Sequence, residues 1–107
     1  MITLEEFKKI DIRIGKVVSA ERVPDSDKLI LLKVDLGSET RQIVAGIAKI
    51  VSDPQELVGK ELPVLINLEP KMLKGYESQG MILATDNNGE PVLLHPARDV
   101  NPGSVVK

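Results

Sequence analysis

The stretch IDIRIGKVV, residues 10–18, decides the fold class. Isoleucines occupy positions 10, 12 and 14 with charged residues between them, and this period of two is typical of a β-strand with one buried face. The alternation stops at Gly15, and a glycine inside a strand pattern indicates a bulge. We therefore predict one long strand over residues 10–23, bent near Gly15.

Further strand patterns follow along the chain. Turn residues after position 23 lead into a second segment with apolar side chains at every second position. Gly37 and its neighbours predict a short connection to the next strand. A long loop is expected over residues 67–78, and a turn at residues 86–89 returns the chain through residues 92–94. The predicted strands after the first cover residues 28–36, 40–46, 62–66 and 80–85.

Two short helices complete the pattern. Thr3 and Glu6 have the spacing of a capping box, which predicts a helix over residues 4–9. Pro54 follows an N-cap residue, which predicts a helix over residues 54–58. Three strands, a helix and two strands is the element order of the oligonucleotide/oligosaccharide-binding (OB) barrel. We therefore predict an all-β, five-stranded OB barrel with a short N-terminal helix and a C-terminal hairpin and tail; another small β-barrel is the alternative.

Composition excludes several classes of function. The chain of 107 residues is the size of one domain, residues 1–107, so a two-domain enzyme is excluded. Without cysteine there is no thiolate nucleophile or Cys-based metal site, and His95 is the only histidine. Nothing in the sequence orients Ser78 and His95 as nucleophile and base. We expect no catalysis, no metal and no other cofactor.

Charge and aromatic content limit how nucleic acid could bind. The net charge is −2, so no field of the whole molecule attracts anions, and any such site must be local. The only aromatic residues are Phe7 and Tyr76, which makes a base-stacking platform improbable. No apolar run approaches the ~20 residues of a membrane span, and residues 1–10 lack a secretory signal pattern. We expect a cytoplasmic protein.

Four segments in fixed order carry a family resemblance. They read FKKIDIRIGKV, DKLILLKVD, RQIVAGI and NLEPKMLKGYESQGM, at residues 7–17, 27–35, 41–47 and 67–81. Together they resemble the tRNA-binding domain at the C-terminus of many methionyl-tRNA synthetases, and the resemblance covers essentially the whole chain. The same module is similar to free-standing dimeric tRNA-binding proteins and to a bacterial export-associated chaperone.

The resemblance implies a non-catalytic OB barrel that dimerises through its terminal elements and grips the outside corner of the L-shaped tRNA. Two positions depart from the family pattern, since the family often has basic residues where this chain has Glu69 and Met72. Lys74 restores one of these charges.

The candidate tRNA-binding residues lie on the second and third strands and in the last of the four segments. Lysine and arginine contact phosphates, and amide or hydroxyl groups contact phosphate and sugar without reading sequence. An exposed methionine beside Gly80 offers an apolar contact to a base or sugar. The alternatives are solvated strand edges for the lysines and a core position for the methionine. The candidates are Lys33, Arg41, Asn67, Lys71, Lys74, Ser78, Gln79 and Met81.

The expected partners are tRNA, a second copy of the chain and the catalytic part of a methionyl-tRNA synthetase. Apolar residues between positions 92 and 106 have no further barrel strand to join, which indicates a two-fold contact. These residues are Leu93, Leu94, Val100 and Val105. Whether the chain is a synthetase domain or a free protein stays open, and a polypeptide-binding chaperone of the same fold is the alternative function.

Overall fold

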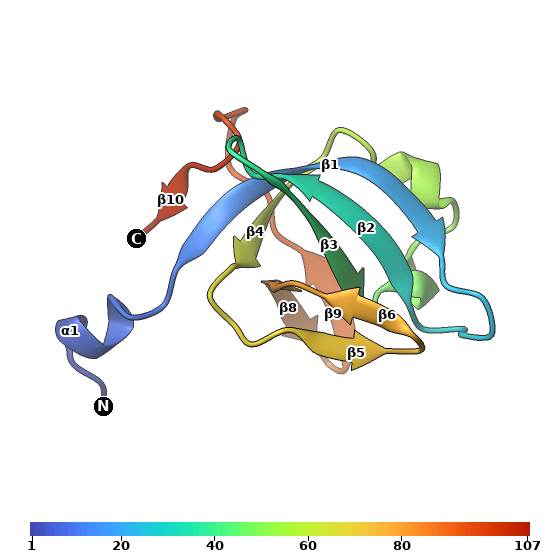
Figure 1. The fold of residues 1–107 in the computed structure, drawn as a ribbon, viewed down its shortest axis with the longest axis horizontal. Coiled ribbons are helices and arrows are strands. Elements are labelled where there is room, and N and C mark those ends of the chain that lie inside the picture. Colours follow the sequence, from blue (N-terminus) through green and yellow to red (C-terminus); the bar gives the residue numbers. More distant parts are fainter.

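The structure, a computed structural model, describes residues 1–107, and all of its strand pairs are antiparallel (Figure 1). Between the third and fourth strands lie two short 3-10 helices, η1 and η2. The elements are α1 (Leu4–Phe7), β1 (Ile12–Arg22), β2 (Ile30–Asp35), β3 (Thr40–Ala45), η1 (Ala48–Ile50), η2 (Pro54–Leu57), β4 (Glu61–Leu65), β5 (Lys71–Leu73), β6 (Tyr76–Ser78), β7 (Met81–Ile82), β8 (Ala84–Asn87), β9 (Glu90–Leu93) and β10 (Val105–Val106).

The main sheet is a nearly closed barrel in the order β3-β2-β1-β4-β7. β1 is long enough to pair with β4 along its first half and with β2 along its second half. The free edges of β7 and β3 approach each other where the amide of Gln79 donates to the carbonyl of Gln42 at 2.8 Å. The five-stranded OB-type barrel predicted from the element order is confirmed.

The irregularity in β1 lies three residues beyond the predicted place. The register with β2 shifts between Val17 and Ser19, so the prediction of a bend at Gly15 was wrong. Gly15 is required for packing instead. A Cβ atom at this position would overlap a methyl carbon of Val34, because it would lie closer than two non-bonded carbons can approach. Because Gly15 has no side chain, the backbone of β1 can approach the core side chains of Val34 and Leu36 closely.

The core fills the barrel with the inward side chains of the long strands. The most deeply buried are Val17, Ile30, Leu32, Val34, Ile43, Leu62 and Val64. η2 packs against β1 and contributes the buried Leu57 to this core. Asp53 caps η2 by accepting from the amide of Gln55, so a helix begins where the sequence predicted one, but its four residues form a 3-10 turn.

The predicted loop over residues 67–78 was wrong, because most of it forms the β5–β6 hairpin. Lys74 and Gly75 are its two turn residues, with positive φ of 51° and 86°. Two successive residues with positive φ characterise the type I′ turn, whose twist matches that of the flanking strands. The predicted strand over residues 80–85 is also divided. β7 pairs with β4, whereas β8 leaves the barrel and pairs with β9 as a separate hairpin.

The two ends of the chain meet beside the barrel. Thr3 and Glu6 exchange both hydrogen bonds of the predicted capping box, although α1 ends at Phe7. β10 pairs with the first residues of β1, so the tail is ordered by joining the sheet edge. Of the apolar residues expected to be free in this region, Leu93 packs against the barrel core and Val105 is exposed. None of the helices could span a membrane.

Candidate nucleic-acid interface

The outer face of β2 and β3 carries one of the predicted cations. Inward and outward side chains alternate along β2, so Lys33 points away from a core that contains Leu32 and Val34. Gln42 is the cross-strand partner of Lys33, and its Oε1 accepts a hydrogen bond from Lys33 Nζ at 2.9 Å. The same face carries the apolar pair of Leu31 and Val44.

The β5–β6 hairpin covers the apolar part of this face. Leu73 and Tyr76 pack against a small cluster outside the barrel that includes Leu31 and Val44. Figure 1 shows the hairpin lying beside β3. Because Tyr76 is half-buried in this contact, its ring supports the hairpin.

Lys71 and Lys74 are exposed on the hairpin that extends the outer face of β3. Lys74 stands at the tip, in the turn, and Lys71 lies in β5 opposite Ser78. Neither lysine forms an ion pair, and neither does Lys33. These three candidate cations are therefore free to meet phosphate.

Ser78 and Gln79 fasten the end of the hairpin to β3. Ser78 is 5% exposed, and its Oγ accepts from the amide of Val44 at 3.0 Å and donates to the carbonyl of Gly80 at 2.9 Å. Gln79 Oε1 accepts from the amide of Gln42 at 3.0 Å. Gln42 Nε2 in turn donates to the carbonyl of Glu77 at 2.9 Å.

Gln42 therefore connects Lys33, β3 and the hairpin, and it was not among the residues predicted from the sequence. A signal for it existed in the strand pattern. Gln42 stands opposite Lys33 in the expected pairing of two neighbouring strands, on their polar face.

Asn67 ties the start of the segment to the first strand. Its Oδ1 accepts from the amide of Asp11 at 2.9 Å, and its Nδ2 donates to the carbonyl of Lys9 at 2.6 Å. The side chain thereby substitutes for a strand partner just before β1. Asn67 thus holds the beginning of the segment, as Ser78 and Gln79 hold its end.

Arg41 occupies the space between these two ends. Its Nη1 donates to the carbonyls of Ile66 and Gln79, and its Nε forms an ion pair with Glu39 Oε1 at 2.6 Å. The hydrogen bond from Arg41 lowers the pKa of the Glu39 carboxyl below its ordinary value.

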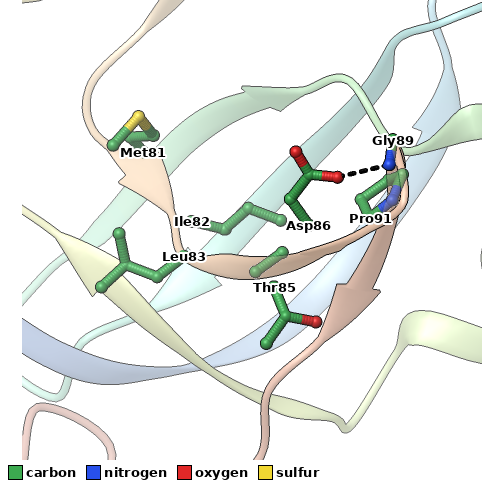
Figure 2. Close-up of a pocket in the computed structure, with 8 residues that line it drawn as sticks. Met81, Ile82, Leu83, Thr85, Asp86, Gly89 and Pro91 are labelled. Carbon is green, nitrogen blue, oxygen red and sulfur yellow. Dashed lines mark hydrogen bonds between the residues drawn. The ribbon is translucent and has the colours of Figure 1, made fainter.

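Met81 lies in β7, which pairs with β4 and stands at the opposite edge of the barrel sheet from β3. Its side chain is 45% exposed, so the core position weighed from the sequence is wrong. Met81 lines a shallow groove of about 370 Å³, together with residues of β7, β8 and the β8–β9 turn. Among these residues, Figure 2 shows Met81 at the opposite end from Gly89 and Pro91. The amide of Gly89 donates to Asp86 Oδ1 at 2.6 Å and closes that turn.

Ser78 and His95 do not meet as nucleophile and base. His95 Nδ1 lies 2.8 Å from the carbonyl oxygen of Glu61, whereas the Ser78 hydroxyl donates to the carbonyl of Gly80. Each group is engaged with a backbone carbonyl in a different part of the fold.

Sequence comparison relates the chain to curated proteins over almost its full length. It is 52% identical to the methionine–tRNA ligase of Archaeoglobus fulgidus over 98% of this chain, and 49% identical to that of Bacteroides fragilis over 99%. The chain spans only 16% of the length of each of these proteins.

Solved structures agree with the sequence comparison. A protein from Pyrococcus horikoshii described as related to methionyl-tRNA synthetase superposes with a TM-score of 0.94 at 38% identity, covering 100% of this chain and 98% of that one. The chaperone CsaA of Bacillus anthracis superposes with a TM-score of 0.89 at 31% identity, covering 100% and 99%. The family model described as "Putative tRNA binding domain" matches residues 12–105. The chain therefore belongs to the tRNA-binding domain family.

Proposed function

We propose that this domain is a non-catalytic module that binds tRNA by shape, at the outside corner of the folded molecule. The observation that carries the proposal is the braced surface formed by the outer face of β2–β3 and the β5–β6 hairpin. It presents Lys33, Lys71 and Lys74 without ion-pair partners, on a backbone fixed by side-chain hydrogen bonds. A fixed set of cations suits phosphates that are themselves held in a fixed geometry.

The scarcity of exposed aromatic side chains on this surface supports recognition by shape. Tyr76 is half-buried and Phe7 belongs to α1, so neither offers a ring to successive unstacked bases. Contacts from lysines and amides place the backbone of the RNA without reading its sequence. The eight predicted residues then divide into exposed groups that face the RNA and bonded groups that hold the surface in shape.

The Met81 groove supplies an apolar contact within this proposal. Met81 and Pro91 lie at its two ends, and Ile82 and Leu83 line its length. A ribose or a base that projects from the tRNA corner fits a shallow apolar surface of this kind.

We further propose that the domain forms a homodimer through its terminal elements. Leu4 and Phe7 of α1, Ile10, and Val105 and Val106 of β10 line an apolar groove of about 420 Å³. A second copy related by a two-fold axis would cover this surface with the same residues.

The similarity to methionine–tRNA ligases supports a proposal about where such a module acts. Because the chain spans 16% of those relatives, we propose that it serves as the C-terminal domain, or a separate subunit, of a methionyl-tRNA synthetase in the cytoplasm. A second attachment point raises the effective concentration of tRNA near the catalytic part.

The likeness to the chaperone CsaA supports a second candidate, binding of unfolded polypeptide. An electrophoretic mobility shift with total tRNA at 50 and 200 mM salt separates the two functions. tRNA binding through three or more phosphates predicts at least a tenfold loss of affinity over this range. Binding of an unfolded polypeptide that is insensitive to salt, with no shift of tRNA, would favour the chaperone.

A further inference from the structure

The strand register places Arg41 among the inward positions of β3. Arg41 pairs across β3 and β2 with Val34, which is fully buried, and it shares its side of β3 with Ile43. Lys33 and Gln42 stand on the opposite side of the same two strands. The Arg41 side chain is 23% exposed and lies at the end of the barrel, away from the outer face.

The guanidinium group of Arg41 is nearly saturated by the protein. Arginine has five N–H donors. Nη1 uses both of its donors on the carbonyls of Ile66 and Gln79, and Nε donates to Glu39 Oε1. Nη2 lies 3.5 Å from Glu39 Oε2. A phosphate would find one unused N–H, beside a carboxylate that repels it.

The two carbonyls that Arg41 binds have a particular place in the chain. Ile66 immediately precedes, and Gln79 immediately follows, the segment 67–78 that forms the β5–β6 hairpin. One side chain therefore joins the two ends of the hairpin to β3. The hairpin also packs on the barrel through Leu73 and Tyr76. Its ends form further hydrogen bonds through the side chains of Gln42, Asn67, Ser78 and Gln79.

We propose that Arg41 is a positioning residue that sets the angle of the hairpin and thereby places Lys71 and Lys74 for tRNA, without itself touching phosphate. This inference rests on the proposed function of the same surface. Because Arg41 is outside the apolar core, its loss leaves the barrel folded and lets the hairpin tilt.

A double-mutant cycle tests the dependence on the hairpin lysines. Arg41→Ala is expected to lower tRNA affinity about 3- to 10-fold, because the hairpin and its lysines must then be ordered on binding. In a Lys71→Ala/Lys74→Ala background the same change is expected to cost about twofold or less, because the groups that it positions are gone. An equal loss in both backgrounds would overturn the proposal.

The salt dependence gives an independent answer. Arg41→Ala is expected to leave the slope of log affinity against log salt unchanged, whereas loss of a phosphate contact lowers its magnitude by about 0.7–0.9. Arg98→Ala, at an exposed position in the tail, is the matched control and should change neither affinity nor slope. A reduced slope in Arg41→Ala would mean that this arginine contacts phosphate.

Amide hydrogen exchange measures the hairpin without RNA. The amides of Val44 and Gln79 bond across the junction of hairpin and β3, and both should exchange faster in Arg41→Ala. Arg41→Lys keeps the charge but cannot bridge both carbonyls, so the same two amides should exchange almost as fast as in Arg41→Ala. The denaturation midpoint of Arg41→Lys should show that this variant is still folded. Unchanged amide exchange in Arg41→Ala would overturn the proposal about Arg41, whether or not the wild type binds tRNA. Failure of the wild type to bind tRNA would count against the proposed function alone.

Discussion

The hydroxyl of Ser78 accepts a hydrogen bond from the amide of Val44 at 3.0 Å, across the junction between the β5–β6 hairpin and β3. Both residues are buried, and the same hydroxyl donates to the carbonyl of Gly80. One small side chain thus satisfies a donor and an acceptor at the place where the barrel closes. The stability of this junction and the shape of the proposed tRNA surface depend on the same bonds.

Ser78→Ala should destabilise the domain by about 1–3 kcal/mol, because the buried Val44 amide loses its acceptor. Chemical denaturation measures this change, with the exposed Ser38→Ala as control. tRNA affinity should fall without a change in salt slope, since no charge is lost. A stability equal to that of the wild type would show that the bond contributes nothing.

Lys71→Ala and Lys33→Ala should each weaken tRNA binding and reduce the magnitude of the salt slope by about 0.7–0.9, because each removes one exposed and unpaired cation. Affinity titrations at four salt concentrations give the slope. Lys107→Ala, at the end of the chain, should leave both quantities unchanged. If Lys71→Ala bound tRNA as the wild type does, the site would lie on another face.

Met81→Ala should cost little stability, since a side chain that is 45% exposed leaves no closed cavity when it is shortened. The expected loss is about 1 kcal/mol or less, against about 2–5 kcal/mol for a core methionine. tRNA affinity should nevertheless fall, with no change of slope. A variant that melts early and binds normally would return Met81 to a purely structural role.

The Glu39–Arg41 pair predicts a dependence of stability on pH. The hydrogen bond from Arg41 lowers the pKa of Glu39 in the folded state, so the pair stabilises the fold above the ordinary glutamate pKa of about 4.3. This stabilisation is lost as pH falls through the lowered pKa. Urea unfolding of wild type and Glu39→Gln should differ at pH 6, and the difference should shrink as the pH falls below the ordinary glutamate pKa. A constant difference would show that ionisation of Glu39 is not involved.

Val105→Lys should prevent dimerisation, because it places a charge on the exposed apolar surface shared by α1 and β10. Sedimentation equilibrium of the wild type at micromolar concentration should give twice the chain mass of 11.7 kDa, and the variant should give 11.7 kDa. Val58→Lys is the control, because it makes the same substitution at an exposed valine outside this groove. A wild type of 11.7 kDa would remove the dimer from the proposed function.

The period of two in residues 10–18 correctly predicted the first strand, because alternation reports which side of a strand is buried. The order of the elements then predicted the barrel. The same reasoning from alternation could have placed Arg41 on the inward side, because residues two apart in a strand share a side and Ile43 is buried. The predicted bend at Gly15 was wrong because packing between neighbouring strands, and not the local sequence pattern, explains the glycine at this position. Gly15 faces Val34 of the neighbouring strand, and no local pattern distinguishes such a contact from a bulge.

The hairpin within the predicted loop was missed for a different reason. Its turn places a lysine, Lys74, at a positive φ beside Gly75, and lysine is not a residue that such a turn favours. Side-chain bonds from Arg41 and Gln42, far away in sequence, hold the hairpin in place. The exposed candidates Lys33, Lys71 and Lys74 could be chosen by charge and family resemblance, whereas Gln42 could be found only from the register.

Recognition by shape is tested most directly by comparing two affinities in one buffer at 100 mM salt. One is the affinity for folded tRNA, and the other is the affinity for an unstructured single strand of the same length. A surface of fixed cations with no ring to stack on should bind folded tRNA at least tenfold more tightly, because only the folded molecule presents its phosphates at matching positions. Equal affinity for the two RNAs would contradict recognition of a folded corner.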